Sequence, residues 1–351
     1  MSVQAPTEPR LLGSGQAPKW PDCSVSGPKA ILEKLPQLSV LIVGDICIDR
    51  WCHYSPAHAE PSRETGIPRT AVIRTETTAG AAGTIANNLA SLGVGLVSVL
   101  GAIGDDGFGV ELARALAARG ISSEPMVRTP LIQTFTYTKL INNDTGAEDL
   151  PRVDFINTAD LPLAVEAMLI QRFHEIAPQF DLIVVSDQAE TASGGVVTPK
   201  MRDVICSHAA AGNLVWVDSR RRAEHFRHAV VKPNEDEAAE ASTRALGHVD
   251  MQALRRHMES PLLIVTHGGE GAAVFDDTGE RLIPGARIAN PVDICGAGDS
   301  FTAGAATALK ITGSAEEAVR FGNLVASITV MKPGTGTASP TEVLARGGVR
   351  P

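Results

Sequence analysis

The chain has 351 residues, 44% of them hydrophobic and 20% charged, which is the composition of a folded globular protein with a sizeable core. Its net charge of −9 argues against nucleic acid as a general partner, because phosphate-backbone contacts need clustered Lys and Arg. No apolar run reaches the ~18 residues of a membrane span, and no signal-peptide core is recognisable. The five cysteines include no C-x-x-C pair, which favours a reducing compartment. We therefore expect a cytoplasmic protein.

The predicted elements follow a flexible N-terminal extension. Residues 1–37 are rich in Pro, Gly, Ser and Gln and carry at most a short helix at 29–35. The folded part, 38–345, opens with an apolar run typical of a strand buried on both faces. Strands are predicted at 39–45, 71–75, 96–100, 134–141, 182–186, 214–218, 229–231, 262–266 and 272–275. Helices are predicted at 81–92, 107–118, 161–177, 198–211, 235–243, 250–258, 299–311 and 315–331.

The order of these elements predicts an α/β fold. From about residue 180 onward strands and helices alternate, which indicates a mostly parallel sheet with helices on both faces. Ligands of such sheets bind outside the carboxyl ends of the strands. Segments 50–78 and 130–157 interrupt the alternation with extended, polar residues, and we expect them to form a small β lid over that cleft.

The stretch D-I-C-G-A-G-D (293–299) is the strongest local signal for chemistry. Glycines allow an anion to approach the backbone, and N–H groups at a helix start bind anions through unpaired donors and the helix dipole. A carboxylate at this point, Asp299, could accept a proton from an attacking hydroxyl. It could equally be a helix cap. These seven residues alone leave both interpretations open.

Several stretches, in order, resemble the ribokinase-like (PfkB) family of sugar and nucleoside kinases. The resemblance covers about residues 38–341, and the set is specific although each motif alone is weak. The motifs are V-G-D-I-C-I-D-R-W (43–51), G-A-A-G-T-I-A-N-N-L-A-S-L-G (80–93), G-A-I-G-D-D-G-F-G (101–109), K-P-N-E-D-E (232–237), V-T-H-G-G-E-G-A (265–272) and D-I-C-G-A-G-D-S-F-T-A-G (293–304).

This resemblance implies a ribokinase-like three-layer sandwich with a β lid, and ATP-dependent phosphorylation of a sugar hydroxyl. Asp299 would be the general base, and the backbone N–H groups of Gly296, Ala297 and Gly298 would form an anion hole. Asn234 and Glu237 would act near Mg²⁺, with Glu237 reaching the ion through water. The residues expected around the nucleotide are Thr266, Gly268, Gly271 and Asn323. Asp293 and segment 332–336 match a monovalent-cation site, such as one for K⁺.

On the sugar side, the resemblance assigns Asp45 and Asp49 as acceptors of hydrogen bonds from sugar hydroxyls. The other residues expected at the sugar are Gly80, Ala81, Thr84, Arg152 and Asp154. The expected small-molecule partners are therefore a sugar or sugar phosphate and ATP. The lid could also form a homodimer contact, as in many relatives, or cover the site of a monomer.

Within the family the chain is most similar to bacterial heptose 7-phosphate kinases, the kinase half of bifunctional ADP-heptose synthesis proteins. S-R-E-T-G-I-P (62–68), R-V-D-F (152–155) and G-T-A-S-P-T-E (336–342) carry this narrower likeness. No H-x-G-H motif follows the kinase region, so a stand-alone kinase is expected.

Three positions depart from the pattern of these kinases. Ala81 replaces the second glycine of a pair, Thr84 replaces an asparagine expected at the sugar, and Glu190 replaces a lysine. The basic run 219–227 is either a solvated turn or a compensating phosphate contact. Ribose, fructose or a nucleoside therefore remain alternative acceptors, and a non-catalytic sugar-binding protein is the alternative of another class.

Overall fold

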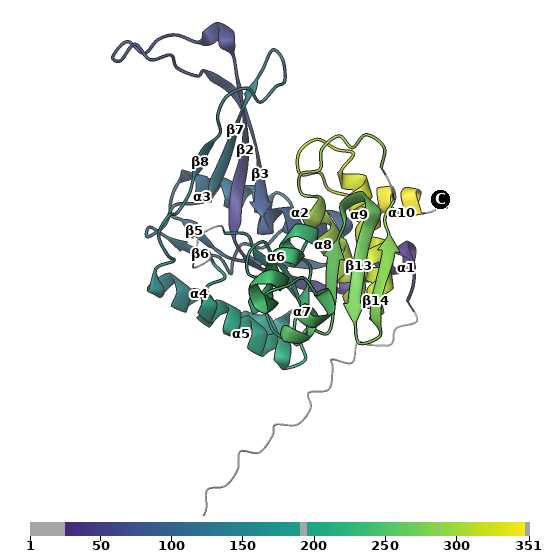
Figure 1. Cartoon of the computed structure of the whole chain (residues 1–351). Helices are drawn as coiled ribbons and strands as arrows, with labels where there is room; N and C mark the ends of the chain where they lie inside the picture. Colours follow the sequence, from purple (N-terminus) through teal and green to yellow (C-terminus); the bar gives the residue numbers. More distant parts are fainter. Residues whose placement is uncertain (1–24, 190–194, 287, 348–351) are drawn as a thin grey trace, which may run out of the picture.

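The computed structural model describes residues 25–189, 195–286 and 288–347 (Figure 1). Its centre is an eight-stranded sheet with the order β14-β13-β12-β11-β10-β9-β1-β4. The six strands from β4 to β12 are parallel, and β13 and β14 are antiparallel additions at one edge. The strands are β1 (Ser39–Gly44), β4 (Leu96–Leu100), β9 (Leu182–Asp187), β10 (Val215–Ser219), β11 (Val230–Val231), β12 (Leu263–Thr266), β13 (Gly271–Asp276) and β14 (Gly279–Pro284).

Helices cover both faces of this sheet, as predicted. Alternation along β1 shows why: Val40 and Ile42 enter one core, while Leu41 and Val43 enter the other. The first core is completed by α1 (Pro28–Lys34), α2 (Ala82–Leu92), α3 (Gly107–Ala117), α8 (Ala297–Thr312), α9 (Ala315–Thr329) and α10 (Pro340–Gly347). The second is completed by α4 (Leu163–Ile176), α5 (Pro199–Ala210), α6 (Glu235–Leu246) and α7 (Met251–His257).

A second sheet rises above the body as the predicted lid (Figure 1). Its order is β3-β2-β7-β8, with β2 (Ile46–Tyr54), β3 (Val72–Ala81), β7 (Thr136–Asn142) and β8 (Val153–Phe155). The prediction missed β2 as a strand and ended the strand at 71–75 too early, because these half-exposed strands lack a continuous apolar run. A small parallel pair, β5 (Ala102–Gly104) and β6 (Val127–Thr129), lies apart from both sheets.

The fold differs from the prediction at both ends of the kinase region. The helix α1 packs with Ile31 and Leu35 fully buried, so folded structure begins before the predicted boundary at residue 38. Residues 1–24 of the predicted extension lie outside the described residues. The edge strand β14 and the last helix α10 were not predicted either. Among the described residues, no helix is long and apolar enough to cross a membrane.

Candidate active site

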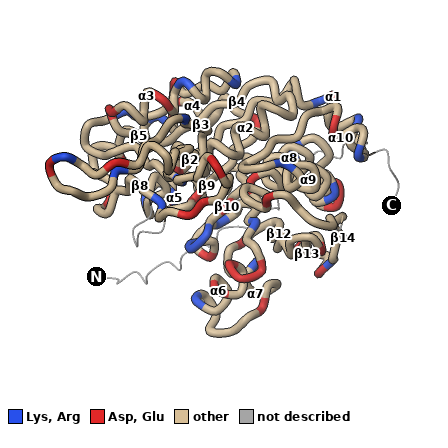
Figure 2. Tube along the Cα trace, turned by 90° about the horizontal axis from the view of Figure 1, so that it is seen from above, with Lys and Arg blue, Asp and Glu red and all other residues tan. Residues whose placement is uncertain are grey.

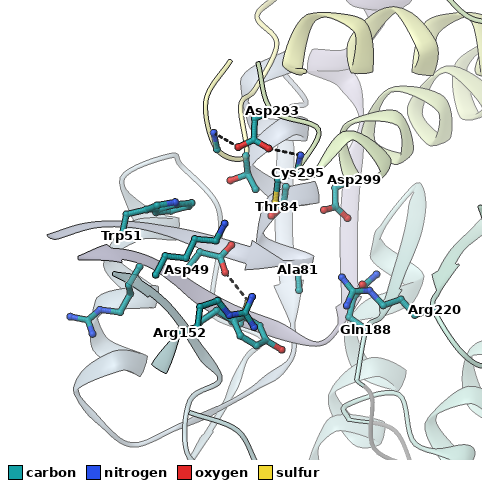
Figure 3. Close-up of a pocket in the computed structure, with 17 residues that line it drawn as sticks. Asp49, Trp51, Ala81, Thr84, Arg152, Gln188, Arg220, Asp293, Cys295 and Asp299 are labelled. Carbon is teal, nitrogen blue, oxygen red and sulfur yellow. Dashed lines mark hydrogen bonds between the residues drawn. The ribbon is translucent and has the colours of Figure 1, made fainter. Parts of the chain in front are cut away.

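The carboxyl ends of the parallel strands meet at one edge of the large sheet, facing the lid. A cavity of about 350 Å³ lies there, bounded by strand ends on one side and by the inner face of the lid on the other (Figure 3). This is where ligands of open α/β sheets bind. Its lining includes Cys47, Asp49, Arg50, Trp51, Ala81, Thr84, Tyr137, Lys139, Arg152, Gln188, Arg220, Asp293, Cys295, Gly296, Asp299, Gly334 and Thr335.

The start of α8 forms the floor of this cavity. Gly296 occupies the N-cap position in the left-handed region, with φ +75°, which glycine adopts at little cost. The methyl groups of Thr84 and Thr335 would each lie 3.2 Å from a Cβ at this position. No side chain caps the helix; Ala297 N donates to the carbonyl oxygen of Ile294 at 3.2 Å, and the other N–H groups at the helix start remain for an anion. The geometry fits the predicted anion hole.

Asp299 stands in the first turn of α8 and faces the cavity (Figure 3). Burial, and after it the neighbouring charge of Asp218, raise the pKa of its carboxyl to about 7 against the opposing charges of Lys232 and Arg220. A carboxyl with a pKa near neutrality accepts protons efficiently at physiological pH. Asp299 is therefore better suited to proton transfer than an ordinary exposed helix cap.

The lid presents a second carboxylate, Asp49, to the same cavity. Burial raises its pKa to about 6, and the charges of Lys139 and Arg152 oppose the shift. Arg152 donates to Asp154 Oδ2 at 2.5 Å and lies over the ring of Tyr137. The other oxygen of Asp154 is buried without a partner in the described part of the chain, so it can accept a hydrogen bond from a ligand hydroxyl.

Two neighbouring residues at the base of the lid, Gly80 and Ala81, are constrained in different ways. A Cβ at Gly80 would collide with the carboxylate of Asp49, so only glycine fits there. The next residue, Ala81, has φ +53° and ψ −119°, a conformation that side chains rarely adopt. Ala81 lines both the main cavity and an adjoining one of about 240 Å³ under the lid.

Backbone N–H groups surround the carboxylate of Asp45, the other aspartate predicted at the sugar. Its Oδ2 accepts from the backbone N–H groups of Gln188 and Ala189, and its Oδ1 from that of Val196, all at 2.8 Å. The residue is 7% exposed and lines only the adjoining cavities. Asp45 thus holds the backbone of Gln188, Ala189 and Val196 in place. The departure at Glu190 lies outside the described residues.

The predicted magnesium element forms a capping box at the start of α6. Asn234 Oδ1 accepts from Glu237 N at 2.8 Å, and Glu237 Oε2 accepts from Asn234 N at 2.9 Å. Burial raises the pKa of Glu237. The cap uses one oxygen of Glu237, so the other fits a water molecule of a hydrated Mg²⁺.

The predicted nucleotide residues separate into two groups. Gly268 has open space where a Cβ would lie, and Asn323 has a buried amide nitrogen with no partner among the described residues; their place at the nucleotide stays a prediction. Thr266 ends β12 and bridges to Asn234. Gly271 is buried, and a Cβ there would collide with the backbone of β14, so its requirement for glycine comes from packing.

Asp293 connects the two loops beside α8. Its Oδ1 accepts from Cys295 N at 2.9 Å and its Oδ2 from Gly334 N at 3.0 Å, as the dashed lines in Figure 3 show. In the described ranges no group of three or more His, Cys, Asp or Glu side chains could hold a metal ion. A monovalent cation at this point would therefore depend on backbone carbonyls.

The structure also adds residues that sequence reasoning had not singled out. Trp51 and Lys139 join the cavity from the lid, and a buried ion pair, Asp218 with Lys232, lies beside Asp299. Seen from above, acidic and basic segments adjoin near the labels of β9 and β10 (Figure 2). Asp218 ends the predicted strand 214–218 and Lys232 directly follows the predicted strand 229–231, a signal that could have found both.

The basic run 219–227 divides between two environments. Arg220 lines the cavity, whereas Arg222 is buried and donates to Asp187 Oδ1 at 2.7 Å and to the carbonyl oxygen of Ala189 at 2.7 Å. Neither predicted alternative describes the whole run. Arg220 lies at the cavity, and Arg222 stabilises the end of β9.

Known proteins with similar sequences include two called bifunctional protein HldE. The protein from Caulobacter sp. (strain K31) is 32% identical over 331 residues, covering 89% of this chain and 64% of the relative. The protein from Methylococcus capsulatus is 31% identical over 319 residues, covering 88% and 64%. The chain thus spans less than two thirds of the length of these relatives.

Solved structures with the same fold include two sugar kinases. Phosphofructokinase-2 from Escherichia coli in complex with potassium has a TM-score of 0.68 at 20% identity, covering 88% of this chain and 98% of that one. Ribokinase from Arabidopsis thaliana complexed with ribose and ATP has a TM-score of 0.63 at 18% identity, covering 89% and 99%. These likenesses confirm the predicted ribokinase-like fold.

A family model decides the classification. The model described as pfkB family carbohydrate kinase matches residues 37–342, which include both the lid and the start of α8. The chain therefore belongs to the pfkB family of carbohydrate kinases.

Proposed function

We propose that this protein transfers the terminal phosphoryl group of ATP to a hydroxyl of heptose 7-phosphate. The observation that supports this best is the placement of Asp299, with a pKa of about 7, at an uncapped helix start that faces Asp49 across the cavity. A base and an anion-binding backbone thus adjoin, and the lid supplies hydrogen-bond acceptors for a sugar.

In the proposed reaction, Asp49 and Asp154 orient the acceptor through its hydroxyl groups. Asp299 accepts the proton of the attacking hydroxyl. At the same time the oxygen of that hydroxyl forms a bond to the γ-phosphorus, and the bond from that phosphorus to the ADP oxygen breaks. Backbone N–H groups at Gly296–Gly298 stabilise the charge on the phosphoryl oxygens. Mg²⁺ near Glu237 and Asn234 would neutralise charge on the nucleotide phosphates.

A phosphorylated acceptor is supported by the cations of the lid. The charges of Lys139 and Arg152 both act on Asp49, so they lie near the predicted sugar position. Phosphate groups are recognised by such charge-assisted hydrogen bonds. The motifs similar to heptose 7-phosphate kinases, in particular R-V-D-F (152–155), include Arg152 and Asp154.

A second acceptor class is favoured by one observation at the sugar end. Thr84 replaces the asparagine expected there, and its methyl group faces Gly296 rather than offering an amide. Arg152 is also already paired with Asp154. An unphosphorylated sugar such as ribose or fructose, or a nucleoside, is the alternative that these features support.

The test is an ADP-release assay with heptose 7-phosphate, fructose, fructose phosphates, ribose and nucleosides. We expect turnover with heptose 7-phosphate, and a fall in kcat of ~10²–10⁴-fold in Asp299→Asn. Asp203→Asn, a change at an exposed position of α5, is the matched control and should keep wild-type activity.

Each outcome separates the alternatives. Turnover with another acceptor but not with heptose 7-phosphate would reject the substrate while keeping the kinase. Near wild-type turnover in Asp299→Asn would reject the base. Calorimetric binding of a sugar without ADP release from any acceptor would instead support a non-catalytic binding protein.

A further inference from the structure

A lysine and an aspartate form a buried ion pair beneath the start of α8. Lys232 Nζ lies 2.8 Å from Asp218 Oδ2, and the two residues are 4% and 5% exposed. They come from the ends of the neighbouring strands β10 and β11. A lysine is almost never buried without a partner, and a buried pair of this kind is costly to form.

The pair is attached to the first turns of α8. A Cβ at Gly298 would lie 3.5 Å from Lys232 Nζ, so the ammonium group lies against the backbone of the expected anion hole. One turn further, Thr302 Oγ1 donates to Asp218 Oδ2 at 3.1 Å. Residues four apart share a helix face, so both contacts fix the pair on one side of the helix that carries Asp299.

We propose that Lys232, held in place by Asp218, is a positioning residue that acts through Asp299. Its ammonium group favours the charged form of the Asp299 carboxyl and supplies positive charge beside the backbone that would receive the phosphoryl group. The catalytic meaning of this inference rests on the proposed kinase reaction. The electrostatic relationship between the three side chains does not.

The charges around Asp299 decide in which direction each substitution would shift its pKa. Burial is the largest cause of its raised pKa, and Asp218 and Asp49 add to the shift, whereas Lys232 and Arg220 oppose it. The thiols of Cys47 and Cys295 also face Asp299, and burial raises the pKa of each, which keeps both neutral. Removing the charge of Lys232 should therefore raise the pKa of Asp299, and removing that of Asp218 should lower it.

The two expected shifts in the pKa of Asp299 have opposite signs, and this distinguishes an electrostatic role of the pair from a structural one. If the pair only packed the strand ends against α8, breaking it from either side would disturb the helix start in the same way. If the pair acts through its charges, the pKa of Asp299 moves in opposite directions when either charge is removed. The conservative change Lys232→Arg keeps the charge, and Thr302→Val removes a hydrogen bond without changing any charge.

The experiment is a carbon-13 NMR titration of the Asp299 carboxyl carbon in the protein without nucleotide or sugar, assigned through its loss in Asp299→Asn. We expect a midpoint near pH 7 in the wild type. The midpoint should move up by roughly one pH unit in Lys232→Met and down by a similar amount in Asp218→Asn. Lys232→Arg and Thr302→Val should stay close to the wild type, and circular dichroism establishes that each variant is folded.

Unchanged midpoints in folded Lys232→Met and Asp218→Asn, or shifts in the same direction, would overturn the inference. Because this titration requires no turnover, it remains decisive even if the proposed reaction fails with every acceptor. With an active acceptor, the acidic limb of the kcat/KM profile should move in the same directions as the NMR midpoints. A profile that stays fixed while the midpoints move would reject the role through Asp299 in catalysis but keep the kinase assignment.

Discussion

Asp49 lies diagonally across the β2–β3 ladder from Gly80, which pairs with Cys47, and a methyl group at Gly80 would collide with the Asp49 carboxylate and lie 2.7 Å from Cys47 Sγ. The glycine therefore sets the position of a side chain that faces the cavity. This relationship links the first motif of the chain, V-G-D-I-C-I-D, to the second, which begins at Gly80.

Replacing Gly80 by alanine should weaken acceptor binding. The added methyl displaces Asp49, so we expect the KM for the acceptor to rise by about 10-fold or more, which corresponds to ~1.4 kcal/mol, while the KM for ATP stays constant. Steady-state kinetics with each substrate varied in turn would measure both. Gly107→Ala, where a Cβ meets nothing within 4 Å, is the control. Equal rises in both constants would contradict the role of Gly80 at Asp49.

Asp45→Ala should destabilise the fold rather than act mainly on sugar binding. The change leaves three backbone N–H groups without their acceptor, those of Gln188, Ala189 and Val196. Each unsatisfied donor costs about 1–3 kcal/mol, so we expect a loss of at least about 3 kcal/mol in the free energy of unfolding. Urea denaturation measures it, with the exposed Asp203→Ala as the reference. Wild-type stability combined with a raised acceptor KM would restore the sugar-contact interpretation.

Asp299→Asn should stabilise the protein at high pH. The pKa of Asp299 is raised to about 7 in the folded state, so the folded protein binds the proton more tightly than the unfolded chain. Stability then falls as pH rises from about 4 to about 7. The variant lacks this loss and should be more stable by up to about 4 kcal/mol at pH 8, with the difference vanishing near pH 4. Thermal unfolding at both pH values tests this, and a constant difference between variant and wild type would refute it.

Ala81→Gly should also be stabilising, which is unusual for a change to glycine. Ala81 has φ +53°, so glycine relieves backbone strain that we expect to outweigh the added freedom of the unfolded chain by about 1 kcal/mol. The neighbouring Ala82→Gly, inside α2, should instead cost about 1 kcal/mol. Denaturation of the two variants side by side compares them. A loss of stability in both would show that Ala81 is not strained.

The sequence determined most of the large sheet and its helices. Buried parallel strands are continuous apolar runs, and β4 was predicted at its observed bounds, 96–100. The edge strand β14 and the lid strand β2 were missed because their exposed faces carry polar residues, and such patterns resemble loops. The helix start at Gly296 and the capping box at Asn234–Glu237 both depend on residues close together in the chain, so short motifs drew attention to both places.

Only the tertiary structure decided how distant charges share the site. Asp45 and Asp49 are four residues apart, yet the first accepts three backbone hydrogen bonds, from Gln188, Ala189 and Val196, whereas the second faces the cavity. Asp218 and Lys232 form an ion pair because two neighbouring strands end at the same edge. A local pattern specifies a strand or a cap, because its hydrogen bonds are local. The burial and pairing of a charge depend on which strands become neighbours, which no single stretch of sequence contains.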